Sequence, residues 1–183
     1  MIVDERLVTY INSLDTGNTE ILDQIEKEAI AAYVPIIRKE MQSFLKLLLA
    51  MQKPMRILEV GTAVGFSAIL MAQYAPADCK IVTIENYEKR IPVAKENFKR
   101  AGKDEQITLL EGDAMQILPT LSGEFDMIFM DAAKGQYINF MPDILRLLKS
   151  GGVLVSDNVL QDGDIIESHY VVERRNRTIY KRM

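Results

Sequence analysis

From residue 56 onward, short apolar runs alternate with longer amphipathic segments. The short runs are too brief for helices and predict strands at 56–60, 80–84, 107–110, 125–130 and 153–156. The segments between them have apolar residues at helical spacing and are bounded by Gly, Pro, Asn or Asp; they predict helices at about 67–73, 88–101, 114–121 and 137–148. Apolar strands that alternate with helices indicate a parallel sheet covered on both faces. We therefore predict a doubly wound α/β fold with a mostly parallel sheet.

The first 54 residues follow a different pattern. Three amphipathic stretches, at about 4–14, 19–33 and 38–51, carry apolar residues three and four positions apart, and Pro35 and Pro54 interrupt the region. We read it as an N-terminal helical cap (1–54) on an α/β core (55–183). The 183 residues suffice for one domain of this kind.

Charge and composition exclude several classes of function. The net charge of −4 provides no global positive field for DNA or an anionic membrane, so any contact with nucleic acid needs a local patch. The basic run 173–182 is either such a patch or the solvated face of a helix. With one cysteine, Cys79, and one histidine, His169, neither an intramolecular disulfide nor a Cys/His zinc site is expected. The N-terminus shows no signal peptide or membrane span, which predicts a cytoplasmic protein.

Ligands of open parallel sheets bind beyond the carboxyl ends of the strands. The first predicted strand runs into a loop of small residues that begins Glu59-Val-Gly61-Thr62, and the second ends at Glu85, at a spacing that suits a carboxylate holding ribose hydroxyls. The loop is not G-x-G-x-x-G and not a phosphate loop, which disfavours nicotinamide and ATP. The remaining strands lead to Asp113, to Asp131 with Lys134, and to Asp157 with Asn158.

Each of these residues also has a purely structural interpretation. Gly61 and Gly65 can serve a tight turn, Asp113 a helix N-cap, the pair 157–158 an Asx turn, and Lys134 the solvated surface. Chance explains the joint pattern poorly, because acidic or amide residues end four of the five strands near one crevice.

Together, these segments resemble the class I S-adenosylmethionine-dependent O-methyltransferases of the catechol and caffeoyl-CoA type, whose fold is Rossmann-like. The resemblance spans residues 34–159 and is carried by ILEVGTAVGFSAILMA, VTIENYEKR, LLEGDAMQILP, FDMIFMDAAKGQY and GGVLVSDNVL. DAAKGQY and a VPI segment ahead of the first strand are similar to the bacterial tRNA 5-hydroxyuridine methyltransferases.

The resemblance implies roles for particular residues. It places Glu59, Gly61, Thr62 and Ser67 around the methionine part of the cofactor, and Ile36 in contact with the cofactor through its backbone. It further implies ribose contacts from Glu85, adenine contacts from Asp113 and Ala114, divalent-metal ligation by Asp131, Asp157 and Asn158, and Lys134 as general base. Asp131 counts both as a cofactor contact and as part of the catalytic pair with Lys134.

The chemistry of these side chains agrees with the implied roles. Two carboxylates and an amide oxygen suit Mg²⁺, with Mn²⁺ possible. A divalent ion lowers the pKa of a hydroxyl and fixes its position for in-line methyl transfer. A nearby cation is also expected to depress the pKa of Lys134, so that a neutral amine can accept the hydroxyl proton.

The leading hypothesis is therefore Mg²⁺-dependent methylation of a ring hydroxyl, with 5-hydroxyuridine in tRNA as acceptor and 5-methoxyuridine as product. A catechol-like or caffeoyl-CoA-like small molecule is the alternative acceptor, and a non-catalytic cofactor-binding subunit is the alternative of another class. The resemblance also implies a homodimer. The family's fold ends in an antiparallel strand hairpin, which we expect this chain to lack.

Overall fold

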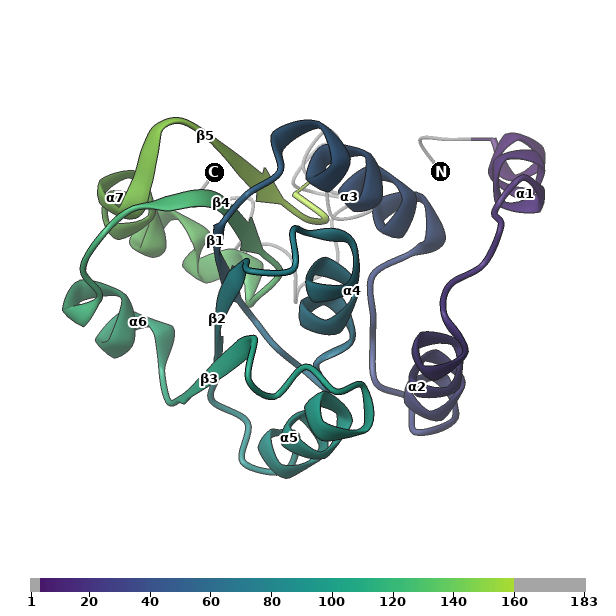
Figure 1. The fold of residues 1–183 in the computed structure, drawn as a ribbon, viewed down its shortest axis with the longest axis horizontal. Coiled ribbons are helices and arrows are strands. Elements are labelled where there is room, and N and C mark those ends of the chain that lie inside the picture. The colour runs from purple at the N-terminus through teal and green to yellow at the C-terminus, as the bar shows by residue number, and fades with distance from the viewer. Residues whose placement is uncertain (1–3, 160–183) are drawn as a thin grey trace, which may run out of the picture.

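A five-stranded parallel sheet forms the centre of the computed structural model, which describes residues 4–159 (Figure 1). Its strands are β1 (Arg56–Val60), β2 (Lys80–Glu85), β3 (Ile107–Glu111), β4 (Phe125–Met130) and β5 (Leu148–Ser156), in the order β3-β2-β1-β4-β5. The neighbouring strands in this sheet all pair in parallel. The predicted α/β class is confirmed.

The strand order places a crevice beside β1. From β1 the chain proceeds outward to β2 and β3, then returns to the other side of β1 to form β4 and β5. The crossovers on the two sides of β1 therefore diverge, which is where open α/β sheets bind ligands. Backbone bonds continue the alignment past the strands: Asp131 N donates to Val60 O, and Asp157 N donates to Met130 O, each at 2.9 Å.

Helices cover both faces of the sheet. Helices α4 (Phe66–Tyr74) and α5 (Ile91–Arg100) lie on one face, and α6 (Ala114–Ile117) and α7 (Tyr137–Leu147) on the other (Figure 1). The predicted cap consists of α1 (Glu5–Ser13), α2 (Glu20–Ala31) and α3 (Lys39–Gln52), of which α2 and α3 pack against α4. In Figure 1, α1 projects from the side of the molecule that α2 and α3 form.

The alternation of side chains along the strands produces two cores. Ile57 and Phe129 point into the core beneath α2–α5, whereas Leu58 and Ile128 point into the core beneath α6 and α7. All four are fully buried. This explains why the strand sequences are apolar throughout rather than alternating with polar residues.

The observed bounds differ from the predicted ones mainly at element ends. Strand β5 begins at Leu148 rather than 153, with a register irregularity opposite residues 125–127. The predicted helix 114–121 is an α-helix only to Ile117 and continues as the 3₁₀ turn η1 (Leu118–Thr120), in which Pro119 has no backbone N–H to donate. Helix α5 starts at Ile91, with Pro92 in its first turn.

Some expectations concern residues outside the described range. The expected absence of the hairpin, the histidine His169 and the basic run 173–182 all concern residues beyond 159, outside the described range. Among residues 4–159, none of the helices is sufficiently long and apolar to span a membrane.

Candidate active site

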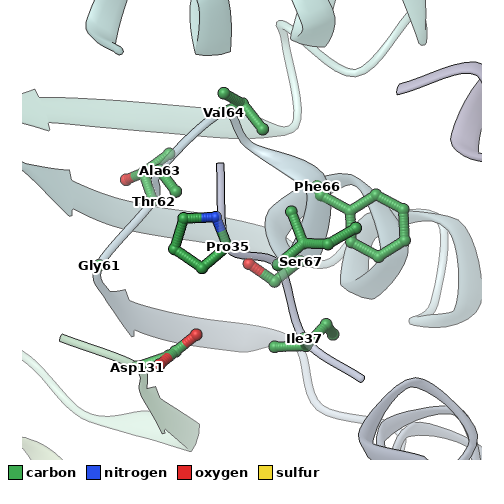
Figure 2. Close-up of a pocket in the computed structure, with 10 residues that line it drawn as sticks. Pro35, Ile37, Gly61, Thr62, Ala63, Val64, Phe66, Ser67 and Asp131 are labelled. Carbon is green, nitrogen blue, oxygen red and sulfur yellow. The ribbon is translucent and has the colours of Figure 1, made fainter. Parts of the chain in front are cut away.

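A pocket that opens to solvent lies at the carboxyl end of β1 (Figure 2). The segment between α2 and α3 forms one part of its wall, the β1–α4 loop and the start of α4 form another, and Asp131 lies at one side. The lining residues are Pro35, Ile36, Ile37, Gly61, Thr62, Ala63, Val64, Phe66, Ser67 and Asp131. Five of the predicted site residues are therefore brought together: Ile36, Gly61, Thr62, Ser67 and Asp131.

The two glycines of the β1–α4 loop are required by close contacts. Gly61 has φ 105°, and a Cβ there would collide with the carbonyl oxygen of Asp131. Gly65 has φ 86°, and a Cβ there would lie 2.5 Å from the ring of Phe98. The tight-turn interpretation of these glycines is confirmed, and the turn also brings the β1 loop against the end of β4 beside the pocket.

Glu59 lies behind the pocket wall rather than in it. Its side chain is fully buried, and its two carboxylate oxygens accept hydrogen bonds of 2.5 Å from Ser67 Oγ and Thr83 Oγ1. Thr83 Oγ1 also lies 2.5 Å from Thr62 Oγ1. Burial raises the pKa of Glu59 to about 7, although the two hydroxyl donors oppose the shift. The carboxylate thus connects two pocket-lining hydroxyls, those of Thr62 and Ser67.

Glu85 supports the same loop from β2. Its carboxylate accepts from the backbone N–H groups of Ala63, Asn86 and Tyr87 at 2.7, 3.0 and 2.8 Å. The bond to Ala63 N reaches the pocket wall directly. Glu85 is therefore placed beside the pocket, although it does not line it.

Asp113 and Ala114 lie farther along the same edge of the sheet and do not line the pocket. The Asp113 side chain accepts from Met115 N at 2.9 Å and caps α6, so the helix-cap interpretation is confirmed. Ala114 is buried in the core beneath α6 and α7.

Asp131 and Lys134 form an ion pair at the pocket's edge. The 3₁₀ turn η2 (Lys134–Gln136) places Lys134 Nζ 2.6 Å from Asp131 Oδ1 and 3.1 Å from Tyr137 Oη. The Lys134 side chain is only 12% exposed, so its interpretation as a solvated surface residue is wrong. Burial alone would lower the pKa of Lys134, but the charge of Asp131 and the hydrogen bonds outweigh it and raise the pKa. The depressed pKa predicted beside a bound cation stays a prediction.

Tyr137 fixes this arrangement, and the sequence reasoning did not identify it. Its hydroxyl donates to Met130 O at 2.9 Å and accepts from Ala132 N at 3.3 Å, in addition to contacting Lys134. A hydroxyl-bearing residue three positions after Lys134, where a helical turn begins, was the signal in the sequence.

The chemistry of Asp131, Asp157 and Asn158 fits a hard divalent cation. Burial raises the pKa of Asp157, and so does the negative charge of Asp131, which means that the two carboxylates repel each other. Asn158 follows in a left-handed conformation, φ 54°. The described residues include no cluster of three or more His, Cys, Asp or Glu side chains suited to a metal ion, and this set has two carboxylates and one amide. An oxygen-liganded ion such as Mg²⁺ would relieve the repulsion.

Comparison with known proteins identifies the class. The sequence pattern of the O-methyltransferase family matches residues 12–182, and the chain belongs to this family. Over 130 residues it is 39% identical to a catechol O-methyltransferase from Niastella koreensis, an alignment that covers 69% of this chain and 59% of that protein. The chain thus spans less than two thirds of that relative's length.

Two further proteins extend the comparison. A catechol O-methyltransferase from Mycobacterium tuberculosis is 35% identical over 160 residues, which cover 86% of this chain and 73% of that protein. The solved structure of the O-methyltransferase TomG from Streptomyces achromogenes, in complex with S-adenosylmethionine, superposes with a TM-score of 0.82 at 29% identity, covering 97% of this chain and 82% of that one. The Rossmann-like fold expected from the resemblance is therefore confirmed.

Proposed function

We propose that this protein transfers a methyl group from S-adenosylmethionine to a ring hydroxyl. The observation that carries the proposal is the position of Asp131, which lines the pocket beside the Gly61 loop and also pairs with Lys134. A cofactor in the pocket and an acceptor at the Lys134 side would therefore meet at one residue. Family membership and the S-adenosylmethionine-bound neighbour from Streptomyces achromogenes support the cofactor.

For the cofactor, we assign the pocket wall to the methionine part. Ile36, Gly61, Thr62 and Ser67 line the pocket, and Glu59 orients the Ser67 hydroxyl from behind. Glu85 is assigned to the ribose hydroxyls because its carboxylate lies at the end of β2 and bonds Ala63 N in the wall. The adenine is assigned to the edge at Asp113 and Ala114, at the end of the neighbouring strand β3.

For the acceptor, we assign Asp131, Asp157 and Asn158 to Mg²⁺, with Mn²⁺ as a substitute. The ion, when bound, supplies a lower hydroxyl pKa and a fixed position for the reacting oxygen. We assign Lys134 as the general base: Asp131 and Tyr137 hold its amine at the pocket's edge, and once a bound cation lowers its pKa the neutral amine would take the proton of the acceptor hydroxyl. With the methyl donor bound, the acceptor oxygen would attack the methyl carbon, and the bond from that carbon to the donor's sulfur would break.

Two acceptor classes suit this site because each places two neighbouring oxygens on a ring. The DAAKGQY and VPI segments favour 5-hydroxyuridine in tRNA. The names of the relatives from Niastella koreensis and Mycobacterium tuberculosis favour a catechol-like small molecule. A homodimer and a cytoplasmic location stay predictions.

Transfer of a labelled methyl group tests the proposal. The protein is incubated with tritiated S-adenosylmethionine and Mg²⁺, once with bulk tRNA and once with a dihydroxyphenyl compound. We expect label in one of the two acceptors and none after chelation with EDTA. Label in neither, together with saturable S-adenosylhomocysteine binding, would favour a non-catalytic cofactor-binding subunit. No binding at all would overturn the proposal.

A further inference from the structure

One wall of the pocket is a segment without regular secondary structure, residues 34–38 between α2 and α3. Pro35, Ile36 and Ile37 line the pocket together with the Gly61 loop and Ser67, and in the view of Figure 2 Pro35 lies between that loop and Ser67. Such a segment cannot hold its shape by a helix or strand ladder. What fixes its carbonyl groups therefore decides the shape of this wall.

A buried glutamine of the cap supplies this bond. Gln42, 1% exposed on α3, donates from Nε2 to Ile37 O at 3.1 Å. The same Nε2 donates to Glu26 Oε1 at 3.1 Å, and its Oε1 accepts from Asn18 Nδ2 at 2.8 Å. Both donors and the acceptor of the amide are thus engaged, each by a different segment.

An ion pair fixes the position of Glu26, one of the hydrogen-bond partners of Gln42. Glu26 on α2 accepts from Lys39 Nζ at 2.7 Å through its other oxygen, and Asp15 lies 3.7 Å from the same ammonium. Burial by itself would lower the pKa of Lys39, but Glu26, Asp15 and Asp23 outweigh it and raise the pKa. The lysine therefore keeps its charge at neutral pH. The loop before α2, α2 itself and α3 converge on one amide, whose remaining hydrogen bond goes to the pocket wall.

We propose that Gln42 is a positioning residue for the cofactor: through Ile37 O it holds the 35–37 wall at the distance from the Gly61 loop that the cofactor requires. The inference rests on the proposed binding of S-adenosylmethionine. It gives the helical cap a role in the affinity for the cofactor, in addition to its packing on α4.

Gln42→Met tests the proposal because it keeps the length of the side chain and removes all three hydrogen bonds. We expect calorimetric titration with S-adenosylhomocysteine to show a dissociation constant about tenfold higher, the size of one lost buried hydrogen bond. In steady-state kinetics the KM for S-adenosylmethionine should rise similarly, while kcat at saturating cofactor and the KM for the acceptor stay at wild-type values.

Lys46→Met is the matched control. Lys46 lies one turn further along α3 and donates to Gly17 O at 3.1 Å, so it also fastens the cap without contacting residues 35–37. Both variants should lower the melting temperature, but only Gln42→Met should weaken S-adenosylhomocysteine binding. Equal weakening in both would overturn the proposal, because a general loosening of the cap would then explain it.

A second variant covers the case in which Gln42→Met does not fold. Asn18→Ala leaves Gln42 in place and removes only the donor to its carbonyl oxygen, so we expect about a threefold loss of affinity. Wild-type affinity in folded Gln42→Met, or in Asn18→Ala where the first does not fold, would refute the role of Gln42. Failure of the wild-type protein itself to bind S-adenosylhomocysteine would instead refute the proposed function.

Discussion

The neighbouring strands β1 and β4 each lead to a carboxylate at the same edge of the sheet, and the two carboxylates have opposite surroundings. Glu59 is fully buried and has two hydroxyl groups as partners, with its pKa raised to about 7. Asp131 has a side chain that is 31% exposed and a lysine at 2.6 Å. At Glu59 burial outweighs the two hydroxyl donors, whereas Asp131 has a cationic partner at the pocket. We infer that Glu59 shapes the pocket and that Asp131 takes part in the chemistry.

The largest effect on turnover should come from removing the ammonium group of Lys134 beside Asp131. Lys134→Met should lower kcat by about 10³-fold, within the range for loss of a general base. Methyl-transfer rates with labelled S-adenosylmethionine measure this. Lys149→Met removes a more exposed lysine–carboxylate pair away from the pocket, with Asp126 at 3.0 Å, and should leave kcat unchanged. A Lys134→Met variant with wild-type turnover would mean that the ion pair is only structural.

Removing the carboxylate charge of Asp131 should lower kcat somewhat less. Asp131→Asn should lower kcat by roughly 100-fold, because it removes one charge from a preorganised site. It should also weaken Mg²⁺ binding, measured by calorimetry. Asp126→Asn is the control at the other end of β4, where Asp126 accepts from the N–H groups of Met55 and Arg56. This control should reduce stability and leave turnover intact. Turnover that falls in Asp126→Asn but not in Asp131→Asn would contradict the catalytic role of Asp131.

A smaller effect is expected from the hydroxyl that holds Lys134. Tyr137→Phe keeps the buried ring and removes the bonds to Lys134 and Met130 O. We expect kcat to fall about tenfold, as for other groups that orient a catalytic residue. The KM for S-adenosylmethionine should not change. An altered KM with unchanged kcat would assign Tyr137 to the cofactor instead.

The smallest effect on turnover should come from Glu59→Gln, which should instead change how the free energy of unfolding depends on pH. The folded pKa of Glu59 is raised from the ordinary 4.5 to about 7, so its contribution to stability is complete below pH 4.5 and is lost as the pH rises through 7. The loss amounts to about 3 kcal/mol. Urea unfolding at pH 5 and pH 8 should show this difference in the wild type and in Asp131→Asn, and most of it should vanish in Glu59→Gln. An unchanged difference would show that Glu59 titrates normally.

The sequence predicted the sheet well and the site in part. The strands 56–60 and 125–130 match β1 and β4 residue for residue, because their apolar runs end abruptly at charged or small residues. The start of β5 was missed, since Lys149, Ser150 and two glycines suggest a loop until pairing with β4 is known. The five predicted residues that line the pocket lie next to predicted element ends.

What the sequence could not predict depends on contacts between distant segments. Gln42 looks like any polar residue of an amphipathic helix, and only its hydrogen bonds to Glu26 on α2 and to Asn18 show that its amide is buried and engaged. Similarly, only the pairing of β1 with β2 shows that Thr83 donates to the buried carboxylate of Glu59. Burial and partner choice are tertiary properties, and spacing along the chain carries little information about them.

The strand order has a consequence for folding. Asp131 reaches the Gly61 loop only after β4 has docked on β1, a pairing between segments about 70 residues apart, and the closure of such a long loop is slow. A chain that has formed only β1, β2 and β3 therefore has no complete pocket. Cofactor capture would mark the end of folding, and at a hundredfold excess over its dissociation constant the ligand would stabilise the assembled sheet by about 2.7 kcal/mol through mass action.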